Sequence, residues 1–278
     1  QMQRSLQPAL SADAVLEACT QVYPVEVAEP AGLLPSVQLR PYQKQSLAFM
    51  IDIERSTDVT LAGQRDGTWY QAAGPQIRGG ILADEMGMGK TMVCLSLVLA
   101  NPAKPNATRK TTLVIVNNTL VQQWYDECKR YAPKLDVRKV YSGSKQWTSN
   151  TDILITTPHT LLSSLSGNTE WYRIIIDESH LMDHVGGRKA GATSWAGMSG
   201  RLYPFNASKL WMCTGTPITS GGMRQQLGLL GQIDYGLRFG GEKEFKQSGA
   251  DKLKRIMIRH TKSQRIHGEV ALALPDCD

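Results

Sequence analysis

The sequence predicts an α/β fold in which a parallel sheet is flanked by helices, because short apolar runs alternate with helical stretches along most of the chain. The apolar runs are continuous and rich in Ile, Val and Leu, which suits strands buried on both faces. We expect strands near residues 80–83, 112–116, 136–141, 152–156, 172–177 and 209–213. We expect helices near residues 41–53, 90–100, 119–131, 158–165 and 222–230.

Residues 1–35 differ from this pattern, because they contain four Pro and few apolar runs. We expect an N-terminal arm or linker there, with a short helix from Ala12 to Cys19. Residues 36–278 then form a single domain. Within it, residues 57–76 predict a polar insertion with a hairpin, and residues 186–200 predict a glycine-rich loop.

Composition limits the classes of protein to consider. The chain has 278 residues and a net charge of +6; residues 1–35 hold one Arg against four carboxylates, so their charge is −3 and that of the rest is +9. A basic body fits a polyanionic partner, although a mildly basic soluble protein fits equally well. No apolar run reaches membrane-spanning length, so no membrane span is expected. The five Cys lack a CxxC pair, which predicts reduced thiols in an intracellular, metal-free protein. The chain begins with Gln1, so we expect a fragment of a longer polypeptide.

The segment DEMGMGKT, residues 84–91, lies between a predicted strand and a predicted helix. Such a turn points backbone N–H groups and a helix N-terminus at one place, where a polyphosphate fits. Lys90 would contact the β and γ phosphates and the Thr91 hydroxyl would hold Mg²⁺, whereas an ordinary glycine-rich helix entry is the alternative. Asp84 stands where the general pattern has Gly. The expected ligands of the nucleotide are Asp84, Gly87, Met88, Gly89, Lys90 and Thr91.

A second signal follows the apolar run 173–176, which ends in Asp177 and Glu178. Buried parallel strands place their last residues at the sheet edge where ligands bind. Asp177 would then hold Mg²⁺ beside Thr91, and Glu178 would polarise the attacking water. A strand that merely ends in solvated acids is the alternative.

Six motifs occur in a fixed order: LRPYQ, LADEMGMGKT, LVIVNNTLVQQW, DILITTP, DESH and TGTP. In this combination residues 37–278 resemble the Swi/Snf-type ATPases, which are helicase-like DNA translocases, and LADEMG accounts for Asp84. The resemblance implies the first RecA-like lobe of a two-lobe nuclear motor that uses ATP and Mg²⁺. It also implies double-stranded DNA, nucleosomes or other chromatin proteins, and the C-terminal helicase lobe as partners, with no membrane.

The resemblance further implies roles for individual residues. Gln43 matches the adenine-recognising glutamine, Lys90 the phosphate-binding lysine, and Asp177 and Glu178 the catalytic carboxylates. Gln123 and Trp124 match the motif after the second strand. Residues that match motifs coupling hydrolysis to movement are His180, Thr214, Gly215 and Thr216, and residues that match a motif contacting the DNA backbone are Thr156 and Thr157.

The stretch 252–265 carries six basic residues and no acid. We expect a helix there, with Leu253, Ile256, Met257 and His260 on its apolar face. Its basic face would meet DNA or the second lobe through Lys254, Arg255 and Arg259, although a solvated charged face is equally consistent. Within it, the sequence IMIRHTK resembles the end of the family's first lobe, which usually reads Arg-Arg-Thr-Lys.

Departures from the family pattern, LMDH and Thr219, leave room for a non-catalytic scaffold. Ser179 replaces the usual Ala, LMDH replaces a basic continuation after the DESH box, and Thr219 replaces Asn. These features favour the branch of DNA-repair and helicase-like-transcription-factor members. The alternatives to a DNA translocase in chromatin remodelling or repair are a strand-separating DExH helicase and a nucleotide-gated, non-catalytic scaffold for chromatin or a partner.

Overall fold

The structure is a computed structural model of the 278-residue chain. It describes residues 12–55, 78–140, 147–165, 169–183, 207–219, 223, 226, 229–230 and 253–272. The predicted insertion at 57–76 and the predicted loop at 186–200 lie outside these residues. The first eleven residues of the predicted arm lie outside them as well.

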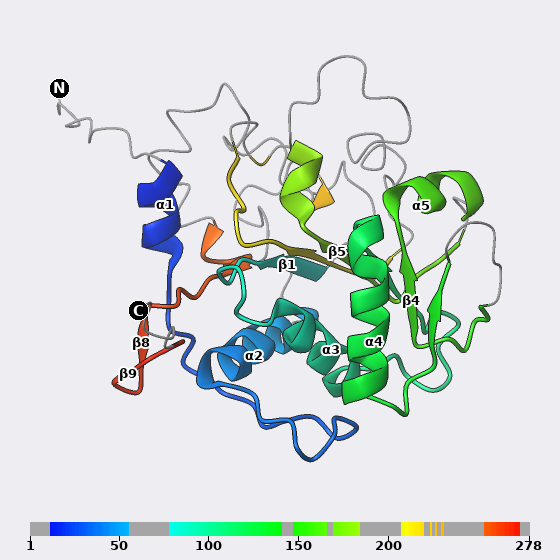
Figure 1. Ribbon diagram of the computed structural model, residues 1–278, viewed down its shortest axis with the longest axis horizontal. Coiled ribbons are helices and arrows are strands. Elements are labelled where there is room, and N and C mark those ends of the chain that lie inside the picture. Colours follow the sequence, from blue (N-terminus) through cyan, green and yellow to red (C-terminus); the bar gives the residue numbers. More distant parts are fainter. Residues whose placement is uncertain are drawn as a thin grey trace, which may run out of the picture.

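The described strands form a seven-stranded sheet in which every neighbouring pair is parallel (Figure 1). The strands are β1 (Arg78–Leu82), β2 (Thr112–Ile115), β3 (Val137–Lys139), β4 (Ile153–Thr156), β5 (Arg173–Asp177), β6 (Lys209–Cys213) and β7 (Met257–Ile258). Their spatial order is β3-β4-β2-β5-β6-β1-β7. The predicted fold class, a RecA-like parallel sheet flanked by helices, is therefore confirmed, and each of the six predicted strands is present.

The helices are α1 (Ala12–Cys19), α2 (Pro41–Arg55), α3 (Lys90–Ala100), α4 (Val121–Tyr131) and α5 (Pro158–Ser164), with 3₁₀ turns η1 (Asn118–Leu120) and η2 (Ser179–Asp183). The predicted helices at 12–19, 41–53, 90–100, 119–131 and 158–165 are confirmed. Of the predicted helix at 222–230, the structure describes Gln226 and Leu229 as helical and places Met223 and Leu230 in turns.

Each face of the sheet carries its own hydrophobic core, because successive side chains along a strand point to opposite faces. Val114 and Ile175 pack with α2, α3 and α4, which lie together on one face (Figure 1). Leu113 and Ile174 belong to the other core, together with α1 and residues of α5. Cys94 and Cys213 lie in the first of these cores, with their sulfurs 3.4 Å apart.

The predicted basic helix over residues 252–265 is wrong. Met257 and Ile258 instead form β7, which pairs with Ile81 and Leu82 of β1. The two residues are buried in opposite cores, so they follow the period of a strand rather than that of a helix. The apolar spacing therefore reflected a short strand between two turns.

The chain then forms a two-stranded hairpin of β8 (Arg265–Ile266) and β9 (Glu269–Val270). The two central turn residues, His267 and Gly268, have φ angles of 54° and 84°, as tight hairpin turns require. Ile266 and Ala271 pack on Tyr42 of α2 and on Met88, so the hairpin covers part of the loop after β1. Within the described residues, no helix has the length and apolar character needed to cross a membrane.

Candidate nucleotide site

The loop at 84–89 connects β1 to α3, and β1 lies between β6 and the edge strand β7. Gly87 and Gly89 have φ angles of 82° and 78°, in the left-handed region that favours glycine. A Cβ at position 89 would lie 2.6 Å from Gln43 Nε2, so the end of the Gln43 side chain would have to shift. The loop conformation therefore depends on glycine at 89 chiefly for its backbone angles.

Lys90 is the first residue of α3, and its ammonium points back into the loop. Its Nζ donates to the carbonyl oxygens of Asp84 at 2.9 Å and Glu85 at 3.2 Å. A Cβ placed on Gly215, in the TGTP turn, would lie 3.6 Å from the same ammonium. Lys90 thus marks the centre of the site, where the loop and the turn after β6 approach each other.

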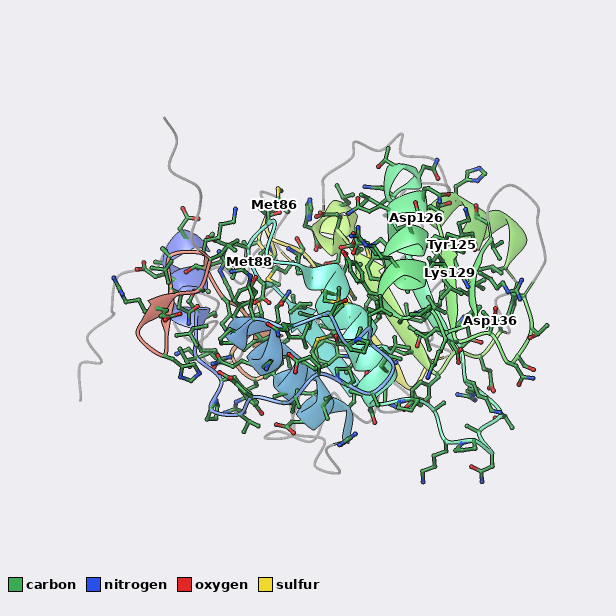
Figure 2. The ribbon with its side chains drawn as sticks, turned by 60° about the horizontal axis from the view of Figure 1, so that its bottom comes forward. Met86, Met88, Tyr125, Asp126, Lys129 and Asp136 are labelled. Atoms are coloured by element: carbon green, nitrogen blue, oxygen red, sulfur yellow. The ribbon has the colours of Figure 1, made fainter. Side chains whose placement is uncertain are left out.

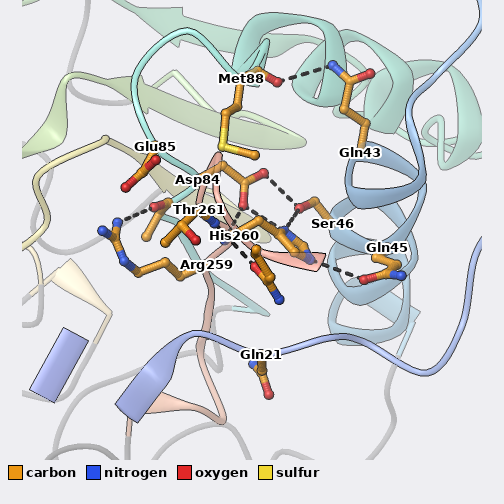
Figure 3. Close-up of polar contacts among 12 residues, drawn as sticks. Gln21, Gln43, Gln45, Ser46, Asp84, Glu85, Met88, Arg259, His260 and Thr261 are labelled. Carbon is orange, nitrogen blue, oxygen red and sulfur yellow. Dashed lines mark hydrogen bonds and ion pairs between the residues drawn. The ribbon is translucent and has the colours of Figure 1, made fainter. Parts of the chain in front are cut away.

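Two methionines flank that centre in opposite ways. Met86 projects from the tip of the loop and is 69% exposed, whereas Met88 is buried beneath it (Figure 2). The carbonyl of Met88 accepts a hydrogen bond from Gln43 Nε2 at 3.2 Å, and Gln43 Oε1 accepts from Arg40 N at 2.9 Å (Figure 3). Gln43, the expected adenine-recognising residue, is therefore held against the loop.

The two acidic residues at the end of β5, Asp177 and Glu178, differ in their surroundings. Asp177 is almost fully buried, and its two oxygens accept from Trp124 Nε1 at 2.8 Å and from Glu178 N at 2.9 Å. Burial raises the pKa of Asp177, opposed by these hydrogen bonds and by the charge of Lys90. Glu178 has a φ of 50°, which is uncommon for a side chain of its kind.

The environment of Glu178 suits a group that accepts a proton. Burial raises the pKa of Glu178, the charge of Asp177 raises it further, and Lys90 opposes both. A carboxylate with a raised pKa binds a proton more readily at neutral pH. Its left-handed backbone turns the side chain away from the direction that the strand would give it.

The residues expected to couple hydrolysis to movement lie close together. His180 Nδ1 lies 2.8 Å from Thr214 Oγ1 and 3.3 Å from Glu178 Oε2. Thr214 Oγ1 also accepts from Thr216 N at 3.1 Å. A continuous polar path therefore joins Glu178 to the turn after β6.

No sequence motif indicated that Gln226 belongs to this region. Its side chain is fully buried; its Oε1 accepts from Ser179 Oγ at 2.7 Å and its Nε2 donates to Asp183 Oδ2 at 2.7 Å and to Pro217 O at 3.0 Å. It thus connects the DESH segment to the TGTP turn. A lone Gln in a helical stretch carries no motif, so only the fold places it here.

The residues expected to hold Mg²⁺ offer suitable donors. Each oxygen of Asp177 accepts one hydrogen bond and so keeps a second lone pair. With the Thr91 hydroxyl, the carboxylate supplies the hard oxygen atoms that Mg²⁺ prefers, and waters and phosphates normally complete its shell. Among the described residues there is no cluster of three His, Cys, Asp or Glu that could hold a metal by themselves.

The residues expected to contact DNA lie partly in the core and partly on the surface. Thr156 and Thr157 are buried; Thr156 Oγ1 donates to Val140 O at 3.4 Å, and Thr157 Oγ1 accepts from Thr160 N at 3.2 Å and caps α5. Both hydroxyls therefore support the local fold. Lys254 and Arg255 are exposed in the turn before β7.

Arg259 points in a different direction from those two residues. Its guanidinium donates to Ala83 O at 2.9 Å and to Gly215 O at 3.4 Å. It therefore lies between the start of the phosphate loop and the TGTP turn. Its expected position on the basic face of a helix is wrong, because β7 directs it into the candidate site.

Asp84 has no exposed surface, and its carboxylate is bound within the protein (Figure 3). Oδ1 accepts from the backbone N–H of His260 at 2.9 Å and lies 2.8 Å from its Nδ1, while Oδ2 accepts from Ser46 Oγ at 2.8 Å. The sequence placed His260 on an apolar helix face, so its position beside the phosphate loop was missed. The acid at the usual Gly position was the signal that a partner was needed.

Comparison with known proteins agrees with this geometry. Residues 42–248 match the family of the SNF2-related domain. The chain is 26% identical over 264 residues to DNA repair protein RAD5B of Arabidopsis thaliana, covering 70% of this chain and 20% of that protein. It is 30% identical over 172 residues to the chromatin structure-remodeling complex subunit snf21 of Schizosaccharomyces pombe, covering 57% of this chain and 12% of that protein. The chain thus spans a fifth or less of either relative.

A solved structure has a similar fold. The SWI2/SNF2 ATPase core of Sulfolobus solfataricus in complex with double-stranded DNA superposes with a TM-score of 0.65 at 20% sequence identity. The similarity covers 86% of this chain and 47% of that one. At this identity the match supports the fold, and it corresponds to about half of the archaeal protein.

Proposed function

The chain belongs to the family of the SNF2-related domain, and we propose that residues 36–278 are the ATP-binding lobe of an ATP-dependent, double-stranded DNA translocase that acts in chromatin remodelling or DNA repair in the nucleus. The observation that carries this proposal is the convergence of the phosphate loop, the DESH segment and the TGTP turn on the ammonium of Lys90. Residues 1–35 are the N-terminal arm of this lobe.

ATP is the proposed substrate. Its polyphosphate would displace the loop carbonyls that now accept from Lys90, and the loop N–H groups at the start of α3 would bind the phosphate oxygens. Gln43 lies against the same loop and would hold the adenine. The remaining residues of the proposed site are Gly87, Met88, Gly89 and Thr91, together with Asp84, whose buried carboxylate holds the loop and does not contact the nucleotide.

Thr91 and Asp177 would hold Mg²⁺, which supplies charge neutralisation at the phosphates when bound. Glu178 would orient the attacking water and accept its proton, which its raised pKa favours. His180 and Thr214 would couple a change in the protonation or position of Glu178 to the TGTP turn, which includes Gly215 and Thr216.

The test separates binding from turnover. Lys90→Ala should abolish ATP binding, because it removes the charge that faces the β and γ phosphates. Glu178→Gln should bind ATP and not hydrolyse it, because an amide is no base. Nucleotide affinity and steady-state hydrolysis should be measured in protein that also carries the second helicase lobe, with exposed Lys104→Ala as the control. Wild-type turnover by Glu178→Gln would remove that residue from its role.

Double-stranded DNA is the proposed polymer, with nucleosomes or other chromatin proteins and the C-terminal helicase lobe as further partners. Lys254 and Arg255 are exposed and adjacent, so they are the described candidates for phosphate contacts. Each phosphate neutralised contributes about −0.9 to the slope of log affinity against log salt. Replacing both residues with Gln should therefore reduce the slope by about 1 to 2 on duplexes of unrelated sequence, relative to Lys104→Gln. An unchanged slope would exclude this turn from the DNA interface.

A further inference from the structure

The imidazole of His260 is fully buried, and both of its nitrogens face hydrogen-bond acceptors (Figure 3). Nδ1 lies 2.8 Å from Asp84 Oδ1 and 3.1 Å from Ser46 Oγ, whose own proton is donated to Asp84 Oδ2. Nε2 lies 3.2 Å from Gln45 Oε1. A neutral imidazole carries one N–H, whereas two N–H groups are needed to satisfy this arrangement.

The orientation of Gln45 is the decisive point, because a flipped amide would offer an N–H to the ring instead. Gln45 Nε2 donates to Glu26 Oε1 at 2.9 Å, and a carboxylate can only accept. Burial raises the pKa of Glu26, but hydrogen bonds from Gln45 and His267 and nearby positive charge lower it overall, so Glu26 is ionised. The amide oxygen of Gln45 must then face His260 Nε2.

From this geometry we propose that His260 is a positioning residue for the nucleotide: an imidazolium that holds Asp84, and through it the phosphate loop, in the conformation that binds ATP. The proposal rests on the proposed function, because it concerns the same phosphate loop. It predicts that nucleotide affinity depends on the positive charge at position 260.

The backbone around His260 follows the loop residue by residue. The pairing of β7 with β1 continues past the strands, since Ala83 N donates to Ile258 O at 2.8 Å and Glu85 N donates to His260 O at 3.1 Å. Lys262 N then donates to Glu85 Oε2 at 2.8 Å. A change at His260 therefore acts directly on the first two residues of the loop.

The positive charge of His260 would also neutralise Asp84 beside the phosphate-binding loop. Asp84 puts a buried carboxylate at the first position of a loop that receives a polyanion, and an uncompensated anion there would repel the phosphates. An imidazolium in contact with Asp84 cancels that charge. A neutral imidazole would leave it in place and would set its Nε2 lone pair against Gln45 Oε1.

The other groups around His260 leave this conclusion intact. Asp84 is the carboxylate in direct contact, and Glu26 acts through Gln45. The ring of Tyr42 lies 6.1 Å away, and burial raises the pKa of its hydroxyl, so it is neutral. Other charged or titratable groups nearby bind elsewhere: Arg259 to Ala83 O, Glu85 to Lys262 N, Lys44 to Glu29, His267 to Glu26, and Lys90 to the carbonyl oxygens of Asp84 and Glu85.

The first test reads the proton itself. Ring ¹⁵N shifts of His260, assigned by comparison with His260→Gln, should show both nitrogens protonated at neutral pH in the wild-type protein. A single protonated nitrogen at neutral pH would overturn the proposal. This measurement involves no nucleotide, so it stands apart from the proposed function.

The second test measures affinity for a non-hydrolysable ATP analogue from about pH 6 to about pH 9, the range in which imidazoles titrate. Wild-type affinity should fall roughly tenfold relative to His260→Arg, the size expected for loss of one charge-assisted hydrogen bond. His260→Arg keeps a permanent cation, so it corrects for titration of the phosphates. His260→Gln should bind about tenfold more weakly than wild type at low pH and follow the pH profile of His260→Arg.

The control is His159→Gln, an exposed histidine on α5 that should keep the wild-type profile. If His260→Gln has wild-type affinity at every pH, the positioning role is wrong. If the wild-type protein binds no nucleotide while its ¹⁵N shifts show the imidazolium, the proposed function fails and this role fails with it, although the ion pair remains. If His260→Arg does not fold, the wild-type and His260→Gln profiles compared with each other give the same decision.

Discussion

Two fully buried ion pairs lie at opposite ends of the parallel strands, one at the amino edge of the sheet and one at its carboxyl edge. They differ in whether the cation is an arginine or a histidine. Arg173, the first residue of β5, pairs with Glu54 of α2, while His260, just past the end of β7, pairs with Asp84. In both pairs neither side chain has exposed surface. Burial alone therefore does not distinguish a structural cluster from one that serves the nucleotide site.

In the pair at the amino edge, Arg173 and Glu54 are bound by other groups of the protein. Arg173 donates to both oxygens of Glu54 at 2.6 Å, to Thr112 Oγ1 at 3.1 Å and to Asn101 O at 2.8 Å. Glu54 also accepts from Trp211 Nε1 at 3.0 Å. Burial lowers the pKa of Arg173, but the charge and hydrogen bonds of Glu54 raise it overall, so its charge is permanent. This cluster joins α2 to β5, β2 and β6.

The pair at the carboxyl edge has a cation that can lose its charge. An imidazole releases a proton near neutral pH, whereas a guanidinium does not. An arginine cluster therefore keeps its ion pair as pH changes. A histidine cluster makes the conformation of the loop beside it depend on pH. The comparison can be tested by removing the acid from each pair.

Glu54→Gln should have the largest effect. The amide would turn an N–H toward the guanidinium and leave Arg173 as a buried charge without a carboxylate, which costs about 3 to 5 kcal/mol of unfolding free energy. Urea denaturation measures this loss. The exposed pair of Glu170 with Arg109 is the control, since Glu170→Gln should cost at most about 1 kcal/mol. Equal losses in the two variants would contradict the role of the buried cluster.

Asp84→Asn should destabilise the protein less, by about 1 to 3 kcal/mol, because it weakens the hydrogen bonds that a buried carboxylate accepts. Nucleotide affinity should nevertheless fall in this variant. It should stay unchanged in Glu54→Gln at denaturant-free conditions where that variant is folded. Titration of a fluorescent ATP analogue into both variants makes the comparison, and an affinity loss in Glu54→Gln alone would reverse the assignment of the two edges.

Glu178→Gln should show the smallest effect on stability, and in the opposite direction. Burial raises the pKa of Glu178, so the folded protein holds that proton more tightly than the unfolded chain does. Ionisation therefore costs stability, and this cost appears as pH rises through the ordinary range of a glutamate and above it. The glutamine variant should have a higher urea midpoint than wild type at neutral pH, with the difference vanishing in acid.

The control for this prediction is Glu17→Gln, because Glu17 is exposed on α1. It should leave the midpoint unchanged across the same pH range. A lower midpoint for Glu178→Gln at neutral pH would mean that the hydrogen bonding of Glu178 outweighs its cost of burial.

Local sequence patterns predicted most of the sheet, because its central strands are continuous branched runs that need burial on both faces. The run 173–176 and the loop 84–91 could be predicted in the same way, since the functional residues of each motif are adjacent in the sequence. The DESH and TGTP segments follow the same rule. What these patterns lack is any information about which distant segments meet.

The misplaced elements are those whose partners lie far away in the chain. β7 has two residues between basic turns, and its strand character comes from pairing with β1. Likewise, nothing near Arg173 announces Glu54, and nothing near Asp84 announces His260, because the members of each pair are separated by 119 and 176 residues. Sequence reasoning therefore found the loop and missed the residue that holds it.

That separation also has a consequence for the order of events during protein synthesis. β1 receives its two neighbours from residues 209–213 and 257–258, long after its own residues have been made. At typical translation rates the interval from β1 to β7 lasts roughly ten to forty seconds. Until residues 209–213 are made the strand has two unpaired edges, and until residues 257–260 are made it has one unpaired edge and its loop has no His260. A nascent chain of this protein therefore exposes an unfinished sheet to chaperones before it can engage ATP.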